Sequence, residues 1–218
     1  MTAAHVVDGV AHIYVKVKSS DRLIEDVLID KSEWCFHSDT NVDISVAPFP
    51  RSLTGAEYHK AYRSENLLTQ EDEEPFLGDP VYFIGMLSMV DAMRLKNIPM
   101  VRSGTIGIMN QDDIPVKGFA KTRRIKAHLI DCRSTNGFSG APCFVQNPVT
   151  GKTKLFGVVA AHFDESIPVS LQGNVTPEVL AHIPMNSGVG VITPIHYLRE
   201  LLNCPHFVGR RYEREAHC

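Results

Sequence analysis

The chain has too few cysteines, in too irregular a spacing, for a disulfide-stapled secreted domain or a zinc site. Its five cysteines are an odd number and no two stand in CxxC spacing: Cys35, Cys132, Cys143, Cys204 and Cys218. Small secreted domains carry dense, even sets of cysteines, and structural zinc sites use closely spaced pairs. We therefore expect buried or idle thiols, no metal and no cofactor. This cysteine usage favours the cytoplasm, but the sequence does not assign a compartment.

Long hydrophobic runs and an excess of one charge are also missing. No stretch approaches the roughly 18 apolar residues of a membrane-spanning helix. The first residues lack the basic flank and apolar run of a signal peptide. The 22 Lys and Arg against 25 Asp and Glu give a net charge of −3, so no basic excess indicates nucleic-acid binding. We expect neither a membrane nor a nucleic acid among the partners.

What the sequence does contain is a series of short runs rich in Val and Ile, separated by turn residues. Examples are residues 11–17, 42–46, 81–85, 104–109, 154–160 and 188–192. Many short strands with turns between them are typical of an all-β sandwich or barrel. Two segments differ: residues 55–68 predict a surface helix, and residues 194–202 predict a C-terminal helix with apolar residues on one face.

The strongest chemical motif is the segment NGFSGAP at residues 136–142, which places Ser139 between two glycines. Gly137 and Gly140 let the backbone bend so that the hydroxyl is exposed and backbone N–H groups converge. Such N–H groups stabilise the oxyanion of an acyl-transfer intermediate. Taken alone, the segment fits a plain turn equally well.

Two further residues complete a candidate catalytic triad, because a serine needs a base to take its proton. His5 lies in TAAH at the start of the chain, and Asp43 lies in the alternating run VDISV. The order His, Asp, Ser is that of chymotrypsin-type enzymes. Asp39, in a turn-like run, is the alternative to Asp43. The other histidines except His162, His128 among them, have no motif around them and are expected in surface or core roles.

The three segments TAAH, VDISV and GFSGAP together resemble the signature segments of trypsin/chymotrypsin-like serine endopeptidases. Further runs resemble strands of the disulfide-free bacterial, HtrA-like branch. Residues 78–85 resemble the last strand of its first barrel, and residues 101–107 resemble the opening strand of its second barrel. Residues 157–161 resemble the strand that pairs with substrate, and residues 188–194 resemble the strand beside the specificity pocket. The resemblance covers residues 2 to about 202.

The resemblance implies a chymotrypsin-like double β-barrel ending in a helix. Residues 1–92 would form a partial first barrel that carries His5 and Asp43, and residues 93–218 a second barrel that carries Ser139. The N–H groups of Gly137 and Ser139 would form the oxyanion hole. The strand at 157–161 would pair with an extended peptide.

The resemblance also implies where a substrate would bind. Ala160, Ala161 and His162 end the substrate-pairing strand, and Gly188 lies beside the specificity pocket. Arg133, six residues before Ser139, stands where the family places the base of that pocket, and it predicts a preference for acidic side chains. The alternative for Arg133 is an outward-pointing surface residue.

Three departures from the family pattern stand out. Phe138 takes the place of an Asp that pairs with a new N-terminus in activated digestive enzymes, so activation by cleavage is not expected. Ala141 replaces a second glycine. Only Met1 precedes TAAH, where the family has three strands. We therefore expect an incomplete first barrel in an N-terminally truncated chain, with His5 poorly fixed near a free end.

The sequence thus predicts a serine endopeptidase that hydrolyses polypeptides through an acyl-enzyme. Two alternatives use the same fold. One is a non-catalytic peptide-binding module, and the other is an esterase with the same triad.

Overall fold

The computed structural model describes residues 1–18, 24–49, 66–69, 72, 74–86, 98–117, 122–132, 137–170 and 179–209. Its elements, in chain order, are α1 (Ala4–Val7), β1 (His12–Lys18), β2 (Ile24–Asp30), a 3₁₀ turn (Lys31–Glu33), β3 (Cys35–Phe36), β4 (Ser45–Val46), β5 (Pro80–Gly85), β6 (Met100–Lys117), β7 (Thr122–Asp131), β8 (Pro142–Gln146), β9 (Thr153–Ser170), β10 (Val179–Pro194) and α3 (Ile195–Leu202). The expected all-β class and C-terminal helix are both confirmed. Most of the helix expected at 55–68 lies outside the described residues.

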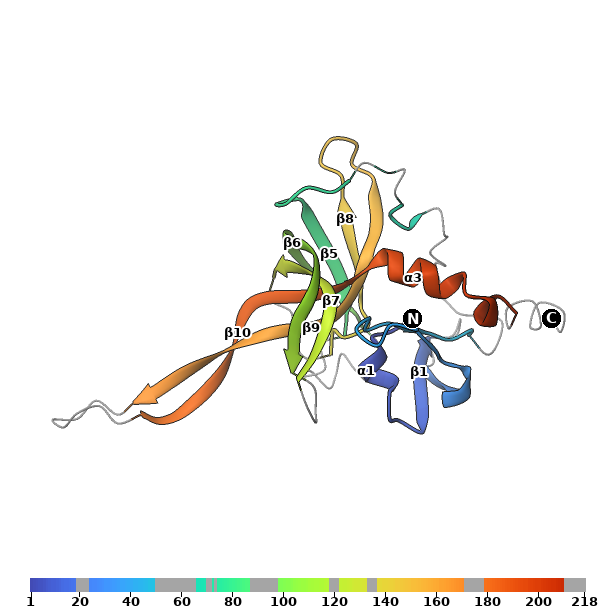
Figure 1. Cartoon of the computed structure of the whole chain (residues 1–218), viewed down its shortest axis with the longest axis horizontal. Coiled ribbons are helices and arrows are strands. Elements are labelled where there is room, and N and C mark those ends of the chain that lie inside the picture. The colour runs from blue at the N-terminus through green and yellow to red at the C-terminus, as the bar shows by residue number, and fades with distance from the viewer. Residues whose placement is uncertain are drawn as a thin grey trace.

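Six strands form a closed barrel in the order β10-β7-β6-β5-β8-β9, with every neighbouring pair antiparallel (Figure 1). Alternate side chains of each strand point inward. Their apolar members fill the barrel with a single cluster that includes Val81, Phe83, Ile130, Phe156 and Ile192. Helix α3 and part of the N-terminal segment pack against this barrel.

Strand β5 belongs to this barrel, which corrects the expectation that residues 78–85 end a first barrel. It pairs with β6 on one edge and with β8 on the other. Val81 and Phe83 are fully buried, while Tyr82 and Ile84, which alternate with them, are exposed. The physical reason is that both edges of β5 are hydrogen-bonded and its apolar face is needed to close the interior.

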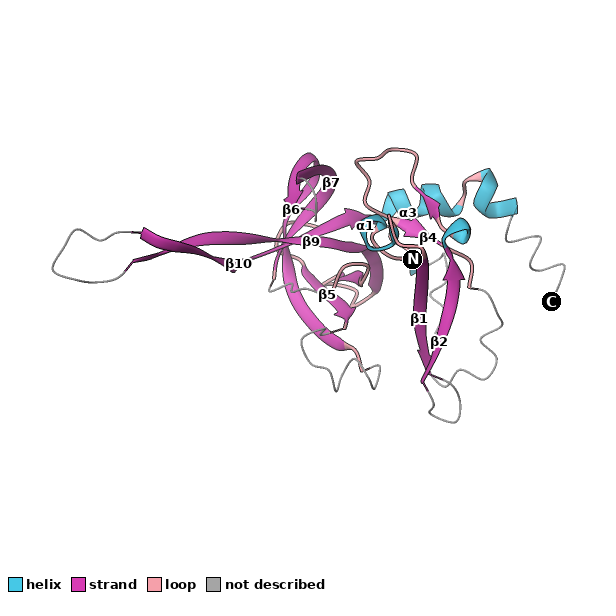
Figure 2. Cartoon of the chain, turned by 90° about the horizontal axis from the view of Figure 1, so that it is seen from below, coloured by secondary structure: helices cyan, strands magenta, loops and turns pink. Residues whose placement is uncertain are grey.

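The N-terminal segment forms two small antiparallel sheets in the described residues, β1 with β2 and β3 with β4. A cluster of Val7, Ile29 and Trp34 holds helix α1 against the β1–β2 hairpin. In Figure 2 this hairpin lies beside the barrel, on the side away from the tip of β9 and β10. Helix α1 is therefore fixed by apolar contacts even though it has only four residues.

A second apolar cluster joins the N-terminal segment to the barrel and to α3. Val42 and Ile44 lie in it together with Val158 of β9 and Leu198 and Leu201 of α3. Ile195, Leu198 and Leu201 form the buried face of α3, as the apolar spacing of residues 194–202 predicts. Burying Val42 and Ile44 fixes the backbone on both sides of Asp43.

Strands β9 and β10 pair from Pro194↔Gly157 to Val179↔Ser170 and continue beyond the barrel as a two-stranded arm (Figure 1). Three register shifts interrupt the pairing. One of them lies between Val191 and Ile192, which pair with Ala161 and Val159. Ala160 is thus the extra residue of a β-bulge, a feature that re-aims backbone groups near binding sites.

Candidate functional site

His5 lies on α1, and the chain before it is anchored rather than loose. Thr2 forms a bridge with Ser45, in which Thr2 N–H donates to Ser45 O at 3.0 Å and Ser45 N–H to Thr2 O at 2.9 Å. Ala4 and Val7 are buried on either side of the histidine. The expectation of a poorly fixed His5 is therefore wrong for this structure, because Thr2 pairs with the segment that carries Asp43.

Asp43 is buried, with 2% of its surface exposed. It precedes β4 rather than lying in an alternating strand, which corrects the expectation drawn from VDISV; only Ser45–Val46 form the strand. Its own carbonyl accepts a hydrogen bond of 3.2 Å from the Thr193 hydroxyl of β10. The backbone turns at Asp43, where Ile44 N–H donates to Val42 O at 3.1 Å, so the strand begins only at Ser45.

The side chains of His5 and Asp43 form a close pair. Nδ1 of His5 lies 2.7 Å from Oδ2 of Asp43, and the His5 backbone N–H donates to Oδ1 at 2.9 Å. Because a carboxylate only accepts, Nδ1 carries the proton and Nε2 of the neutral ring is left as an acceptor. This is the tautomer that a general base requires.

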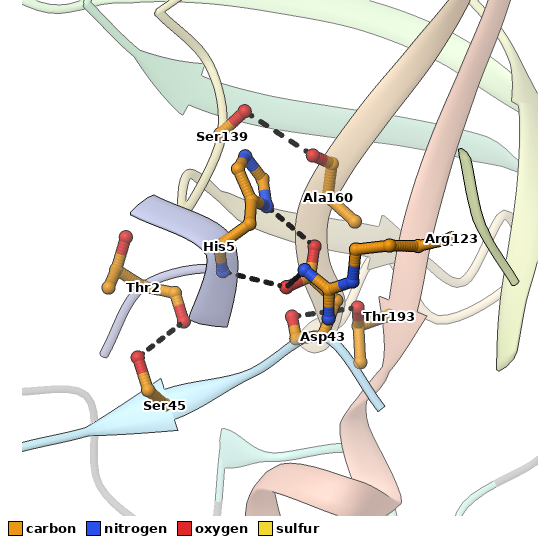
Figure 3. Close-up of polar contacts among 8 residues, drawn as sticks. All are labelled: Thr2, His5, Asp43, Ser45, Arg123, Ser139, Ala160 and Thr193. Atoms are coloured by element: carbon orange, nitrogen blue, oxygen red, sulfur yellow. Dashed lines mark hydrogen bonds and ion pairs between the residues drawn. The ribbon is translucent and has the colours of Figure 1, made fainter. Parts of the chain in front are cut away.

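Ser139 faces the same ring. Figure 3 shows the imidazole of His5 between the carboxylate of Asp43 and the side chain of Ser139. The Ser139 hydroxyl donates to the carbonyl of Ala160 at 3.3 Å, and no hydrogen bond joins it to His5 among the described contacts. The structure brings the three predicted triad residues together, with the serine turned towards the β-bulge of β9.

The turn around Ser139 has the backbone form that its glycines allow. Gly137 and Gly140 have φ values of 97° and 89°, a region that favours glycine. Gly140 N–H donates to Val159 O at 2.7 Å and Ala141 N–H to Phe138 O at 2.8 Å. In the described part of the chain no acceptor is found for the N–H groups of Gly137 and Ser139, the two donors expected in the oxyanion hole.

The side chain of Phe138 anchors this turn in the apolar interior of the barrel. Its side chain is fully buried in the barrel cluster, and the Arg102 guanidinium lies 5.5 Å from its ring centre. An apolar anchor thus occupies the position where the resembled digestive enzymes carry a charged one.

The strand that is predicted to pair with a peptide is only partly open. Gly157 and Val158 pair with β10 on one edge and with Cys143 and Pro142 of β8 on the other. The pairing with β8 ends at Val158, and Val159 accepts from Gly140 N–H at 2.7 Å and donates to Ala141 O at 2.9 Å. Of residues 157–161, the first three therefore already have hydrogen-bond partners on this edge, and the part of the described edge that is open to a peptide begins at Ala160.

The open part of β9 contains the predicted residues Ala160, Ala161 and His162. His162 Nε2 lies 3.4 Å from Oδ1 of Asp164. Gly188 is on the neighbouring strand and has a φ of 84°. Its carbonyl accepts from Cys132 N–H at 2.7 Å, which ties the start of the segment before Ser139 to β10. Arg133 lies outside the described residues, and its role in specificity stays a prediction.

Asp39 is engaged elsewhere, since its carboxylate lies 2.9 Å from Nζ of Lys126. The Asn41 N–H and the Lys126 ammonium hold the pKa of Asp39 below its ordinary value. The alternative to Asp43 thus pairs with β7 and not with His5.

The sequence analysis missed Arg123 of β7, whose Nη1 lies 3.6 Å from Oδ1 of Asp43. Nothing in the basic run KTRRIK distinguishes it from its neighbours. Only the fold shows which of these cations reaches the carboxylate.

The described residues contain no group of three or more His, Cys, Asp or Glu side chains that could hold a metal ion. No helix among the described residues is both long and apolar enough to span a membrane. No protein-family model matches the chain, and no curated protein matches it either.

Proposed function

We propose that the chain is a serine-type endopeptidase of chymotrypsin-like architecture that uses His5, Asp43 and Ser139. The observation that carries the proposal is the 2.7 Å contact between His5 Nδ1 and the buried Asp43 carboxylate, with Ser139 facing the other side of the ring. Three side chains from three distant segments converge in the order that acyl transfer needs.

In the proposed reaction Ser139 Oγ attacks the carbonyl carbon of a peptide bond, and its proton passes to Nε2 of His5. The negative oxygen that develops would be stabilised by the N–H groups of Gly137 and Ser139. His5 then gives the proton to the leaving amine. Water attacks the resulting ester, with His5 again as base, and releases the acid and Ser139. Asp43 keeps the ring in its tautomer and stabilises the imidazolium.

The hydrogen bond from Ser139 to Ala160 O has a consequence for binding. An extended peptide lying on the open edge of β9 would offer its own N–H to Ala160 O, as in β-augmentation. The Ser139 hydroxyl would then lose its present acceptor and turn to Nε2 of His5. Substrate binding and activation of the serine would thus be coupled at one carbonyl.

The same contact favours a second candidate, a peptide-binding module that does not turn over its ligand. A serine held by Ala160 O at 3.3 Å is not hydrogen-bonded to its base. If the serine stays there when a peptide binds, the site binds without reacting. An esterase would use the triad but not the peptide-pairing edge of β9.

A fluorophosphonate probe separates these candidates, because only an activated serine reacts with it. We expect labelling of the wild-type chain at Ser139, and loss of nearly all labelling in Ser139→Ala and His5→Ala. Ser166→Ala, on the exposed part of β9, is the matched control and should label normally.

Hydrolysis of an internally quenched peptide library, compared with small esters, then separates a peptidase from an esterase. Full labelling of His5→Ala would overturn the triad. Peptide binding without labelling or turnover would leave the binding module as the function.

A further inference from the structure

The Asp43 carboxylate has a charged partner besides His5. Arg123 reaches it from β7, with Nη1 3.6 Å from Oδ1 (Figure 3). Asp43 is 2% exposed and the Arg123 side chain 28%. At this distance the contact is an ion pair rather than a hydrogen bond. The guanidinium of a barrel strand, that of Arg123, thus forms an ion pair with the carboxylate of Asp43 in the N-terminal segment.

The burial of the Asp43 carboxylate gives this ion pair its physical importance. A carboxylate removed from water needs compensation by charge and by hydrogen bonds. The two hydrogen bonds to the Asp43 carboxylate both come from His5, one from its backbone and one from its ring. The neutral imidazole supplies no charge. Arg123 is therefore the formal counter-charge in the described surroundings.

The other charged groups near the pair are engaged or lie away from it. Asp39 binds Lys126. Asp8, after α1, is exposed and its N–H binds Ala4 O. Strands β9 and β10 present uncharged Ala160 and Thr193 to this site. Among the described residues, Asp43 and Arg123 are thus the charged groups closest to His5 that have no other ion-pair partner.

We infer that Arg123 is a positioning residue that holds the Asp43 carboxylate against His5 and weakens its pull on the His5 proton. This inference rests on the proposed function, because it assigns Arg123 a role in the same triad. A nearby cation disfavours the imidazolium. The positive charge of Arg123 therefore offsets part of the Asp43 charge that faces the His5 ring.

The test is the Arg123→Met variant of the full chain. Its matched control is Arg124→Met, the next residue on β7, which is exposed and pairs with Asp113 at 2.6 Å. We expect the acid limb of the activity profile to move up by about one pH unit in Arg123→Met. Activity near pH 6 should then fall about tenfold further than activity near pH 9, where only the weaker hold on the Asp43 carboxylate lowers the rate. A merely structural defect would lower activity by the same factor at every pH.

A conservative variant separates charge from shape. Arg123→Lys keeps the charge but loses the planar guanidinium. We expect its acid limb to stay near that of wild type, with a lower rate on the plateau because the carboxylate is less well held. An acid limb of Arg123→Lys that moves as far as that of Arg123→Met would overturn the role of the charge.

A titration by NMR tests the coupling without any substrate. The ring signal of His5, assigned by its absence in His5→Gln, is followed against pH in wild type, Arg123→Met and Arg124→Met. We expect proton uptake about one pH unit higher in Arg123→Met and unchanged in Arg124→Met. In an Asp43→Asn background the substitution of Arg123 should have a smaller effect on His5, as coupling through the carboxylate requires.

The outcomes distinguish the two proposals. A His5 signal that titrates alike in Arg123→Met and wild type overturns the inference about Arg123. A displaced signal in a chain that never labels at Ser139 supports the inference as a statement about the His5–Asp43 pair and counts against the peptidase.

Discussion

The ring of Phe138 meets the ring of Phe83 edge-on, with centroids 5.4 Å apart and planes inclined at 80°. This contact links the turn that carries Ser139 to strand β5 of the barrel. Both rings are fully buried. The turn is therefore fixed by the core and not only by its own hydrogen bonds.

Phe138→Ala should lower the free energy of unfolding by about 3–5 kcal/mol, since it removes a fully buried aromatic ring. Urea titration followed by fluorescence or circular dichroism measures this. Phe76→Ala is the matched control, because Phe76 is 66% exposed, and it should change stability by less than about 0.5 kcal/mol. A loss for Phe138→Ala no larger than the control's would show that the ring is not a structural anchor.

Gly140, in the turn that carries Ser139, lies against Thr2 of the N-terminal segment. A Cβ at Gly140 would overlap the Thr2 side chain, and its φ of 89° already disfavours other residues. Gly140→Ala should therefore push Thr2, and with it His5, away from Ser139. We expect at least tenfold slower labelling by a fluorophosphonate.

Gly151→Ala separates the clash from the backbone strain. Gly151 also has a positive φ, of 68°, but a Cβ there meets nothing within 4 Å. Gly151→Ala should cost about 1 kcal/mol of stability from strain alone and leave labelling unchanged. Equal labelling rates in the two variants would mean that the contact with Thr2 does not position the site.

Asp43→Asn should reduce peptide hydrolysis by about 10⁴-fold while the fold persists. The amide NH₂ would donate to Nδ1 of His5, which shifts the ring proton to Nε2 and leaves no base for Ser139. Steady-state kinetics on a cleaved peptide measure the loss. Asp39→Asn is the control, because Asp39 binds Lys126 and should affect turnover little. A reversed ranking of the two variants would make Asp39 the triad carboxylate.

The sequence was sufficient to predict that Ser139, His5 and Asp43 lie together, because each is in a short segment with a recognisable local form. The sequence also predicted helix α3, because the spacing of its apolar residues matches the face that is buried. The position of β5 was not predictable in the same way. An alternating strand such as Val81–Gly85 shows which face is buried but not which neighbours it pairs with, and pairing depends on closure of the whole barrel.

Arg123 was missed for a related reason, and for the same reason His128 could be assigned only to a surface or core role. Their roles depend on residues far away in the chain: Asp43 for Arg123, and Asn110 and Phe156 for His128. No local pattern distinguishes a cation that reaches a buried carboxylate from one that faces solvent, as Arg124 does on the same strand. Such residues are found only when the fold places their partners.

His128 makes the stability of the barrel depend on pH. It is 5% exposed, its Nδ1 accepts the N–H of Asn110 at 3.0 Å, and its ring stacks on Phe156 with centroids 4.5 Å apart. Burial, with a smaller contribution from nearby His196, lowers the pKa of His128 to about 4 from an ordinary 6.5. The folded state therefore holds this ring neutral.

Because the pKa of His128 is lowered in the folded state, acid destabilises the fold. Between about pH 6.5 and pH 4 the unfolded chain binds a proton at His128 that the folded chain does not, so acidification favours unfolding. The full contribution is about 3 kcal/mol. It is present above pH 6.5 and is lost progressively as the pH falls to about 4.

The measurement is the free energy of unfolding, from urea titrations at several pH values, of wild type and His128→Gln. Gln keeps an acceptor for Asn110 N–H but does not titrate. The variant should be less stable than wild type at pH 7.5, because it loses the stacking on Phe156, and this difference should shrink by up to about 3 kcal/mol as the pH falls to 4. His182→Gln, at an exposed position of β10, should run parallel to wild type throughout. A constant difference between wild type and His128→Gln over this range would show that His128 is not a buried neutral ring.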